Sequence, residues 1–147
     1  MAKLKLEKML LKDIKEYENN PRNNDKALKP VINSIKKFGY VSPIIIDEEG
    51  VILAGHTRIK ALREMGETEA EIIRLYGLTD EEKRSYRIAD NRTHEFSRWD
   101  GDLLEAEMRT INDDDWAQFG FKDKEIRKLQ PDMMCTCPRC GQTFVKV

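Results

Sequence analysis

The chain is poor in the features that mark membrane and secreted proteins. Among its 147 residues no apolar run reaches the roughly 20 residues that a membrane-spanning helix needs. Its first residues, Met-Ala-Lys-Leu-Lys-Leu-Glu-Lys, contain no apolar stretch of the signal-peptide kind. It has only three cysteines, all after residue 134, which disfavours a framework of structural disulfides. We therefore predict a cytoplasmic protein without membrane association.

An excess of positive charge is also missing. The chain has 26 lysines and arginines against 27 aspartates and glutamates, so its formal net charge is −1 and its pI is about 6.2. This balance argues against a protein that coats DNA through bulk charge, so any DNA contact must use a local patch. Lys83, Arg84 and Arg87 are the candidates, because residues three and four apart share one face of a helix. The alternative is a solvated face balanced by the acidic residues 80 to 82.

Apolar residues are nonetheless sufficient for a core beneath a heavily charged surface. They make up 39% of the chain, against 36% charged residues, and the length suits one domain with appendages. The apolar patterning predicts a mixed α/β fold. Strands are expected at residues 4–11, 43–47, 51–54 and 70–76, and helices at residues 28–38, 56–65, 79–91, from 99 onward, and at 121–129.

Three local signals bear on where helices begin. Pro30 is tolerated near a first helical turn but not in a helix interior, so its helix either begins near Lys29 or is kinked there. Thr79 and Glu82 have the spacing of a capping box. The acidic run at residues 113 to 115 is expected to cap a helix rather than bind a metal, because adjacent side chains diverge.

The segment Val-Ile-Leu-Ala-Gly-His-Thr-Arg, residues 51 to 58, has the features of an anion site. An apolar strand ends at Ala54, Gly55 supplies a turn without a Cβ, and a helix follows whose first N–H groups are unpaired and point back at the turn. Thr57 adds a hydroxyl and Arg58 a planar charge on the first helical turn. The alternative is a turn without a ligand, in which Arg58 pairs with an acidic neighbour.

Four short motifs surround or include this turn in a fixed order. They are Asn20-Pro21-Arg22, Ser34-Ile35-Lys36, Gly39-Tyr40-Val41-Ser42-Pro43-Ile44 and Gly55-His56-Thr57-Arg58. In this order and spacing the chain resembles the N-terminal domain of the ParB/sulfiredoxin superfamily over about residues 5 to 95. The resemblance implies a small domain in which a short mixed sheet is flanked by helices.

The resemblance also implies a ligand. ParB-like domains of this kind bind a nucleoside triphosphate with magnesium, with the phosphates on the Gly-x-x-Arg turn and on the arginine of the Asn-Pro-Arg motif. By that comparison the phosphate contacts are expected from Arg22, Gly55, His56, Thr57 and Arg58.

The third nucleotide motif of the family, Glu-Asn-x-Gln-Arg, aligns with residues 90 to 94. Here Asp90 and Asn91 keep the acid and the amide, whereas the glutamine and the arginine are replaced. Asn91 is therefore a further contact candidate, and the departure leaves the identity of the nucleotide open. Sulfiredoxin chemistry is excluded, because its reaction needs a cysteine in the turn that here reads Gly-His-Thr-Arg.

Two classes of function follow from these motifs. The favoured one is a nucleotide-binding, DNA-associated accessory protein of a phage or mobile element in a bacterial or phage-infected cell. Residues 88 to 121 resemble an extension found in phage ParB-like proteins and in the N-terminal domains of some DNA methylases. The alternative is a ParB-like nuclease, or a nucleotide hydrolase or phosphotransferase with a divalent metal, in which His56 and Asp90 are the catalytic candidates.

The C-terminal tail contains the remaining chemical signal. Cys137 and Cys140 have the spacing of a zinc-ribbon knuckle, and Cys135 is a candidate third ligand. A fourth would come from His56, His94, water, or a second chain in a homodimer or partner complex. A disordered end with reduced thiols and a redox role are the alternatives. The resulting organisation is a nucleotide-binding domain at 1–95, a helical extension at 96–130 and the tail at 131–147.

Overall fold

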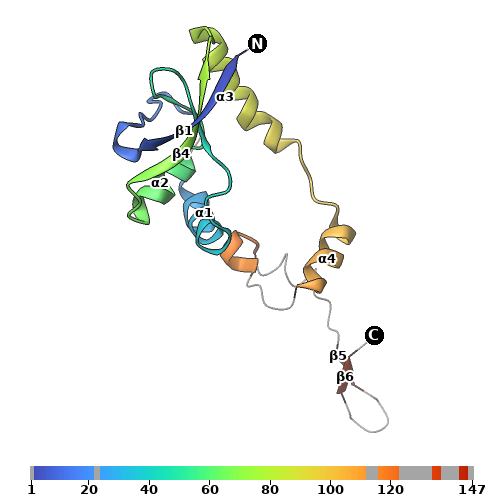
Figure 1. Cartoon of the computed structure of the whole chain (residues 1–147). Helices are drawn as coiled ribbons and strands as arrows, with labels where there is room; N and C mark the ends of the chain where they lie inside the picture. The colour runs from blue at the N-terminus through green and yellow to red at the C-terminus, as the bar shows by residue number, and fades with distance from the viewer. Residues whose placement is uncertain (1, 22–23, 112–115, 123–133, 137–142, 146–147) are drawn as a thin grey trace. The chain divides into compact units, whose positions relative to one another are not determined.

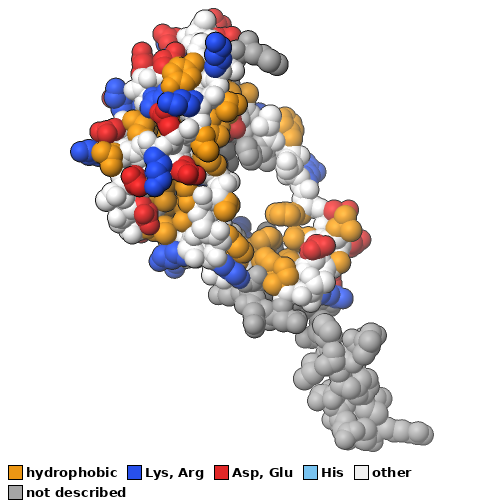
Figure 2. Space-filling model, viewed as in Figure 1, with side chains coloured by type: hydrophobic (Ala, Val, Ile, Leu, Met, Phe, Trp, Pro, Cys, Tyr) orange, Lys and Arg blue, Asp and Glu red, His pale blue; other side chains and the backbone are white. Residues whose placement is uncertain are grey.

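The computed structural model describes residues 2–21, 24–111, 116–122, 134–136 and 143–145. The chain divides into two compact units, Met1–Ser97 and Arg98–Val147, each of which is considered by itself. Within the described part, no helix is long and apolar enough to cross a membrane. Acidic and basic side chains are interspersed over the face of the first unit shown in Figure 2, in keeping with the near-neutral net charge.

The first unit is built on a four-stranded mixed sheet in the order β1-β4-β2-β3 (Figure 1). The strands are β1 (Lys3–Leu10), β2 (Ile44–Ile46), β3 (Ile52–Ala54) and β4 (Glu69–Tyr76). β1 runs antiparallel to β4, β4 parallel to β2, and β2 antiparallel to β3. The predicted mixed α/β fold with a short mixed sheet is confirmed.

Three helices belong to this unit: α1 (Asp25–Phe38), α2 (His56–Glu64) and α3 (Asp80–Glu95). The core contains alternate strand residues together with the apolar stripe of α2, as expected when one face of a sheet packs on a helix. Its central members are Ile44, Ile46, Ile52, Ile59, Leu62 and Ile72, which are all at most 3% exposed. The core therefore lies directly beneath the turn that joins β3 to α2.

Helix α1 begins earlier than we predicted from the position of Pro30. It starts at Asp25 with Asn24 as its N-cap and contains Pro30 in its interior, so a start near Lys29 is wrong. Interior proline removes the hydrogen bond of its own N–H and crowds the carbonyl of the residue four positions earlier, but both effects fall in the first turns of α1. The earlier start brings Asn24 and Ala27 to the same cavity as the β3–α2 turn.

The capping box at the start of α3 is confirmed. The Glu82 N–H donates to the Thr79 hydroxyl at 3.2 Å, and the Thr79 N–H donates to the Glu82 carboxylate at 2.7 Å. These bonds pair two of the N–H groups that a helix start leaves without a partner. They fix where α3 begins, and hence which of its residues face β3.

The second unit contains helix α4 (Gly101–Thr110), the short 3-10 helix η2 (Trp116–Phe119) and the strands β5 (Met134–Thr136) and β6 (Thr143–Val145). The predicted helix from residue 99 is confirmed, with the Asp100 carboxylate capping its first turn. β5 and β6 pair antiparallel. The acidic run 113–115 and most of the helix expected at 121–129 lie outside the described residues.

Candidate functional site

The turn between β3 and α2 is shaped so that only glycine fits. Gly55 is the N-cap of α2 and has φ +104°, a left-handed conformation that side chains rarely adopt. A Cβ on Gly55 would lie 3.2 Å from Cγ1 and 3.3 Å from Cα of Ile44, so the core leaves no room for one. Glycine has no capping side chain, so the first N–H groups of α2 are left for another acceptor.

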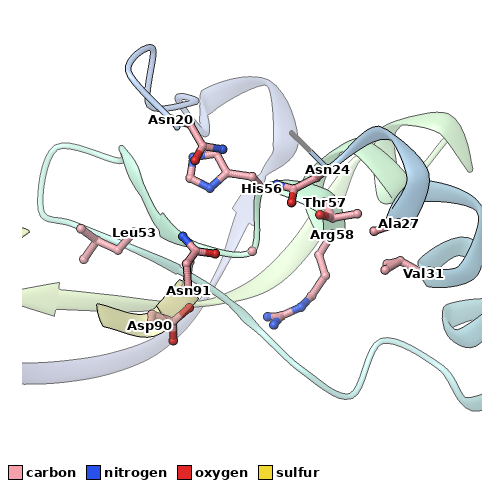
Figure 3. A pocket seen from close by; sticks show the side chains of 12 residues that line it. Asn20, Asn24, Ala27, Val31, Leu53, His56, Thr57, Arg58, Asp90 and Asn91 are labelled. Carbon is pink, nitrogen blue, oxygen red and sulfur yellow. The ribbon is translucent and has the colours of Figure 1, made fainter. Parts of the chain in front are cut away.

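A cavity of about 260 Å³ opens at this turn (Figure 3). Its walls come from the loop before α1, the first half of α1, the end of β3, the start of α2 and the last turns of α3. The lining residues are Asn20, Asn24, Ala27, Val31, Leu53, Ala54, Gly55, His56, Thr57, Arg58, Asp90 and Asn91. The structure thus brings together two groups that the sequence predicted separately, the turn residues 55 to 58 and the pair 90 and 91.

His56 is the most unusual of the lining residues. It is 9% exposed, and its Nε2 is buried without a hydrogen-bond partner among the described residues. Burial of the ring lowers the pKa of His56. The negative charge of Glu16 raises this pKa, whereas the positive charges of Arg87 and Lys60 lower it further. The ring is therefore neutral near pH 7, with a polar nitrogen that a ligand can satisfy.

Arg58 is held at the cavity wall by backbone carbonyls. Its Nη1 donates to the carbonyl oxygens of Pro43 at 2.7 Å and Ser42 at 3.2 Å. Both bonds use the same nitrogen, so the other guanidinium donors are not committed to them. Within the described residues Arg58 therefore pairs with carbonyls and not with the acidic neighbour that was the alternative expectation.

Asp90 and Asn91 reach the cavity from α3. The Asn91 Nδ2 donates to the Arg87 carbonyl at 2.8 Å, which turns the amide along its own helix. Among the described residues that line the cavity, Asp90 is the one with a carboxylate. The described residues contain no group of three or more His, Cys, Asp or Glu side chains that could hold a metal ion by themselves. Magnesium in nucleotide sites is usually held by one or two carboxylates together with phosphate oxygens, and Asp90 is the residue here with that chemistry.

A family model for the ParB N-terminal domain matches residues 2–92, which is more than half of the chain. The chain belongs to this family. Its ParB N-terminal domain contains the whole cavity, from Asn20 to Asn91.

Two relatives share sequence with this ParB N-terminal domain. The ParB-like nuclease domain-containing protein YnaK of Escherichia coli K12 is 37% identical over 83 residues, covering 56% of this chain and 95% of YnaK. The uncharacterized protein ORF326b of Acidianus two-tailed virus is 39% identical over 41 residues, covering 28% of this chain and 13% of that protein.

Solved structures confirm the ParB-N fold at low sequence identity. A Pnob8-like ParB-N domain superposes with a TM-score of 0.53 and 16% identity, covering 99% of this chain and 58% of that one. The truncated chromosome-partitioning protein ParB from Caulobacter crescentus, complexed with CTP-γ-S, gives a TM-score of 0.60 and 16% identity, covering 85% of this chain and 70% of that one.

The three predicted DNA-binding residues do not lie together on one exposed face. Lys83 and Arg87 are each 7% exposed, whereas Arg84 is exposed. The Lys83 Nζ and the Arg87 Nη2 lie 3.9 and 3.8 Å from the Asp47 carboxylate. Helical spacing was correct in grouping Lys83 with Arg87, but the face they share is turned inward because Asp47 is there to pair with both.

We call Asp47, Lys83 and Arg87 the Asp47 cluster. The Asp47 carboxylate also accepts hydrogen bonds from the N–H groups of Glu49 at 3.0 Å and Val51 at 2.8 Å. The Arg87 Nε donates to the Ile52 carbonyl at 2.9 Å, and its guanidinium lies 3.9 Å from the centre of the Tyr17 ring. A second cavity of about 480 Å³ lies beside the cluster.

The remaining predicted ligands are not all within the described part of the chain. Arg22, Cys137 and Cys140 lie outside it, and Cys135 lies in β5 opposite Phe144. Sequence reasoning missed Asn20 and Asn24 as cavity residues, although both lie in the asparagine-rich loop before α1. It also missed Asp47, whose only sequence signal was its place in an acidic turn.

Proposed function

We propose that this chain is a nucleotide-binding module that serves a DNA-associated system of a phage or mobile element and holds the phosphates of its ligand at the turn of Gly55 to Arg58. The observation that carries the proposal is the set of donors left without an acceptor there. The helix start has no side-chain cap, and the buried Nε2 of His56 has no partner among the described residues. An anion with several oxygens satisfies both.

Each residue of the turn has a distinct part in binding the phosphates. Gly55 allows the backbone to approach the anion, and the N–H groups that follow donate to it. The Thr57 hydroxyl adds a donor, and Arg58 adds charge from a guanidinium already fixed by the Ser42 and Pro43 carbonyls. The neutral ring of His56 orients a phosphate oxygen by donating one hydrogen bond.

The rest of the cavity supports a nucleotide in preference to inorganic phosphate. Asn20 and Asn24 present amides and Val31 an apolar wall beyond the turn, which suits a sugar and a base. In this proposal the Asp90 carboxylate holds magnesium against the phosphates. The Caulobacter crescentus protein of the same fold is complexed with CTP-γ-S, which supports the same class of ligand.

A thermal-shift panel of the four ribonucleoside triphosphates with magnesium tests this proposal. At least one is expected to raise the melting temperature of the full chain, and each variant is compared with its own ligand-free melt because Arg58 also supports the fold. A ligand at 100 times its dissociation constant adds about 2.7 kcal/mol of stability. Arg58→Ala and Asn24→Ala should lose the shift, whereas Lys60→Ala, an exposed cation on the same helix, should keep it. A flat wild-type response across the panel would sink the proposal.

For direct DNA contact we propose Arg84, the exposed residue among the three predicted ones. A fluorescence anisotropy titration of duplex DNA against the full chain and Arg84→Glu measures it, since loss of a phosphate contact weakens binding and lowers its salt dependence. Equal affinities for the two proteins would leave DNA association to a DNA-modifying partner.

A nuclease is the second candidate, supported by the relative YnaK, which is named for a ParB-like nuclease domain. A nuclease needs a base and usually a metal, for which His56 and Asp90 are the residues at the cavity. Metal-dependent cleavage of plasmid DNA that disappears in both His56→Ala and Asp90→Asn would establish it. Cleavage that survives both changes would remove this cavity as the site.

A further inference from the structure

The outer edge of β1 is an unusually open strand. β1 lies at the end of the sheet order, and within the described residues no strand pairs with its second side (Figure 1). Its register with β4 is continuous from Lys3 opposite Tyr76 to Leu10 opposite Glu69, without a bulge or a proline. Natural proteins usually shorten, bulge or cover such edges, because their free N–H and C=O groups recruit another strand.

The side chains of β1 add an apolar surface to this edge. Leu4 and Leu6 are 70% and 57% exposed and lie on the same face of the sheet. In the register they are opposite Leu75 and Ile73 of β4, which are only half-buried. This face is turned away from the core, whose side of β4 is formed by the buried Ala70 and Ile72.

Charge shows which strand would fit the edge. Lysines on an edge normally repel a second strand, and β1 has Lys3, Lys5 and Lys8. The exception is a partner that places a carboxylate opposite a lysine. β1 itself contains Glu7, which is two residues from Lys5 and on the same face. Within one chain its carboxylate lies 3.1 Å from the exposed Lys5 Nζ and accepts a hydrogen bond from the Arg74 Nε at 2.7 Å, so a second copy would exchange only the exposed Lys5 contact.

We propose that a second copy of this chain pairs with β1 antiparallel, about a two-fold axis that passes through Leu6 normal to the sheet. Leu6 then lies opposite Leu6 of the second copy, and each Lys5 lies opposite the other copy's Glu7. Leu4 is diagonal to the other Leu6, within reach of cross-strand packing. The two four-stranded sheets become one continuous sheet.

The neighbouring registers are excluded by like charges. A two-fold axis of this kind must pass through a residue, because only then do the same faces of the two sheets stay together. An axis at Lys5 places Lys5 opposite Lys5, and an axis at Glu7 places Glu7 opposite Glu7. Directly opposed like charges destabilise a strand pair, so the axis at Leu6 is selected.

Cysteine cross-linking of the full chain tests the axis, in a background where the three tail cysteines are serine. Opposed residues of antiparallel strands lie about 4.5–5.5 Å apart, which a disulfide spans. Leu6→Cys is therefore expected to form a covalent dimer under mild oxidation. The two copies of residue 4 lie four residues apart along the strand, about 13 Å, so Leu4→Cys is the matched control that should not cross-link.

Charge reversal tests the partner by analytical ultracentrifugation. Lys5→Glu should weaken the dimer by about tenfold, because it opposes like charges at two symmetric positions. Adding Glu7→Lys should restore the wild-type dissociation constant. Glu7→Lys removes the carboxylate that pairs with Arg74 at 2.7 Å, and the new Glu at position 5, directly opposite Arg74 in the register, replaces it. Lys3→Glu, which would lie opposite Met9, should change little. A monomer at all concentrations, equal cross-linking at positions 4 and 6, or a dimer indifferent to Lys5→Glu would each overturn the proposal.

Discussion

The two ends of β3 are both turns lined with hydrogen-bond donors, but only one of them contains its own anion. At the start of β3, the N–H groups of Glu49 and Val51 and the cations Lys83 and Arg87 surround the Asp47 carboxylate. At its end, the first N–H groups of α2 and the His56 ring face a cavity.

The difference distinguishes a structural cluster of charge from a binding site. Asp47 is 2% exposed and its carboxylate is surrounded by donors and cations, so an external anion has nothing to gain there. In the part of the chain that the structure describes, no side chain accepts hydrogen bonds from the start of α2, because its N-cap is a glycine. The cluster that the sequence marked for binding, Lys83 and Arg87, is therefore the internally paired one, and the turn without a carboxylate is the candidate site.

The largest effect on stability is expected from removing the Asp47 carboxylate. Asp47→Ala removes the carboxylate that pairs with the buried Arg87, while Lys83 keeps the carboxylates of Glu48 at 3.6 Å and Asp80 at 3.8 Å. Leaving the Arg87 charge buried without its partner should lower the free energy of unfolding by about 3 kcal/mol. Urea denaturation measures this, with the exposed Glu49→Ala as the control in the same turn. Added formate should stabilise Asp47→Ala more than the wild type. Equal stability of the two variants would break the comparison.

The next effect is expected at the other end of β3. Gly55→Ala forces a side chain into a left-handed conformation and against Ile44, at a cost of about 1–3 kcal/mol, and should abolish nucleotide binding. Gly77→Ala is the matched control, since Gly77 also has a positive φ, of +80°, but open space around it. Both variants should lose stability, and only the first should lose the ligand-induced shift in melting temperature.

A smaller effect is expected from pH. Because burial lowers the pKa of His56 from its ordinary 6.5, the unfolded chain takes up this proton first as the pH falls. The contribution of His56 to stability is therefore complete above pH 6.5 and is lost as the pH falls toward the folded-state pKa. A bound phosphate favours the charged ring, so phosphate affinity should rise over the same interval. In His56→Gln, calorimetric titrations should show neither trend.

The smallest effect on the first unit is expected from the tail. If Cys137 and Cys140 bind zinc as their spacing predicts, purified protein should contain the metal and Cys137→Ser should contain less. Elemental analysis measures the content. Nucleotide-induced shifts should be the same in both proteins, and a change in them would mean that the tail takes part in the cavity.

Much of the candidate site could be predicted from local sequence, because its central part is local. The strand, the glycine and the helix of residues 51 to 58 follow one another directly, and the order of the motifs identified the fold. Whether a helix face points toward solvent or toward the core cannot be predicted from the local sequence. Lys83 and Arg87 share a face by spacing alone, but the groups that pair with them when this face is buried, the Asp47 carboxylate among them, are far away in the sequence.

The start of α1, but not its end at Phe38, escaped prediction for a similar reason. Pro30 was weighed as a local helix breaker, whereas packing against α2 outweighs one missing hydrogen bond. The place of β4 between β1 and β2 likewise depends on pairing between residues far apart in the chain, which no short motif specifies. The asparagines at the start of α1 became visible as cavity residues only with that tertiary arrangement.

Helix α3 is the common wall of both ends of β3. Arg87 belongs to the Asp47 cluster, and Asp90 and Asn91, one turn later, line the cavity at Gly55. Asn91 is also tied to the Arg87 carbonyl. The ion pairs that hold α3 against the start of β3 therefore also fix the position of Asp90 and Asn91 at the other end of the strand, so a change in the Asp47 cluster should be felt at the cavity.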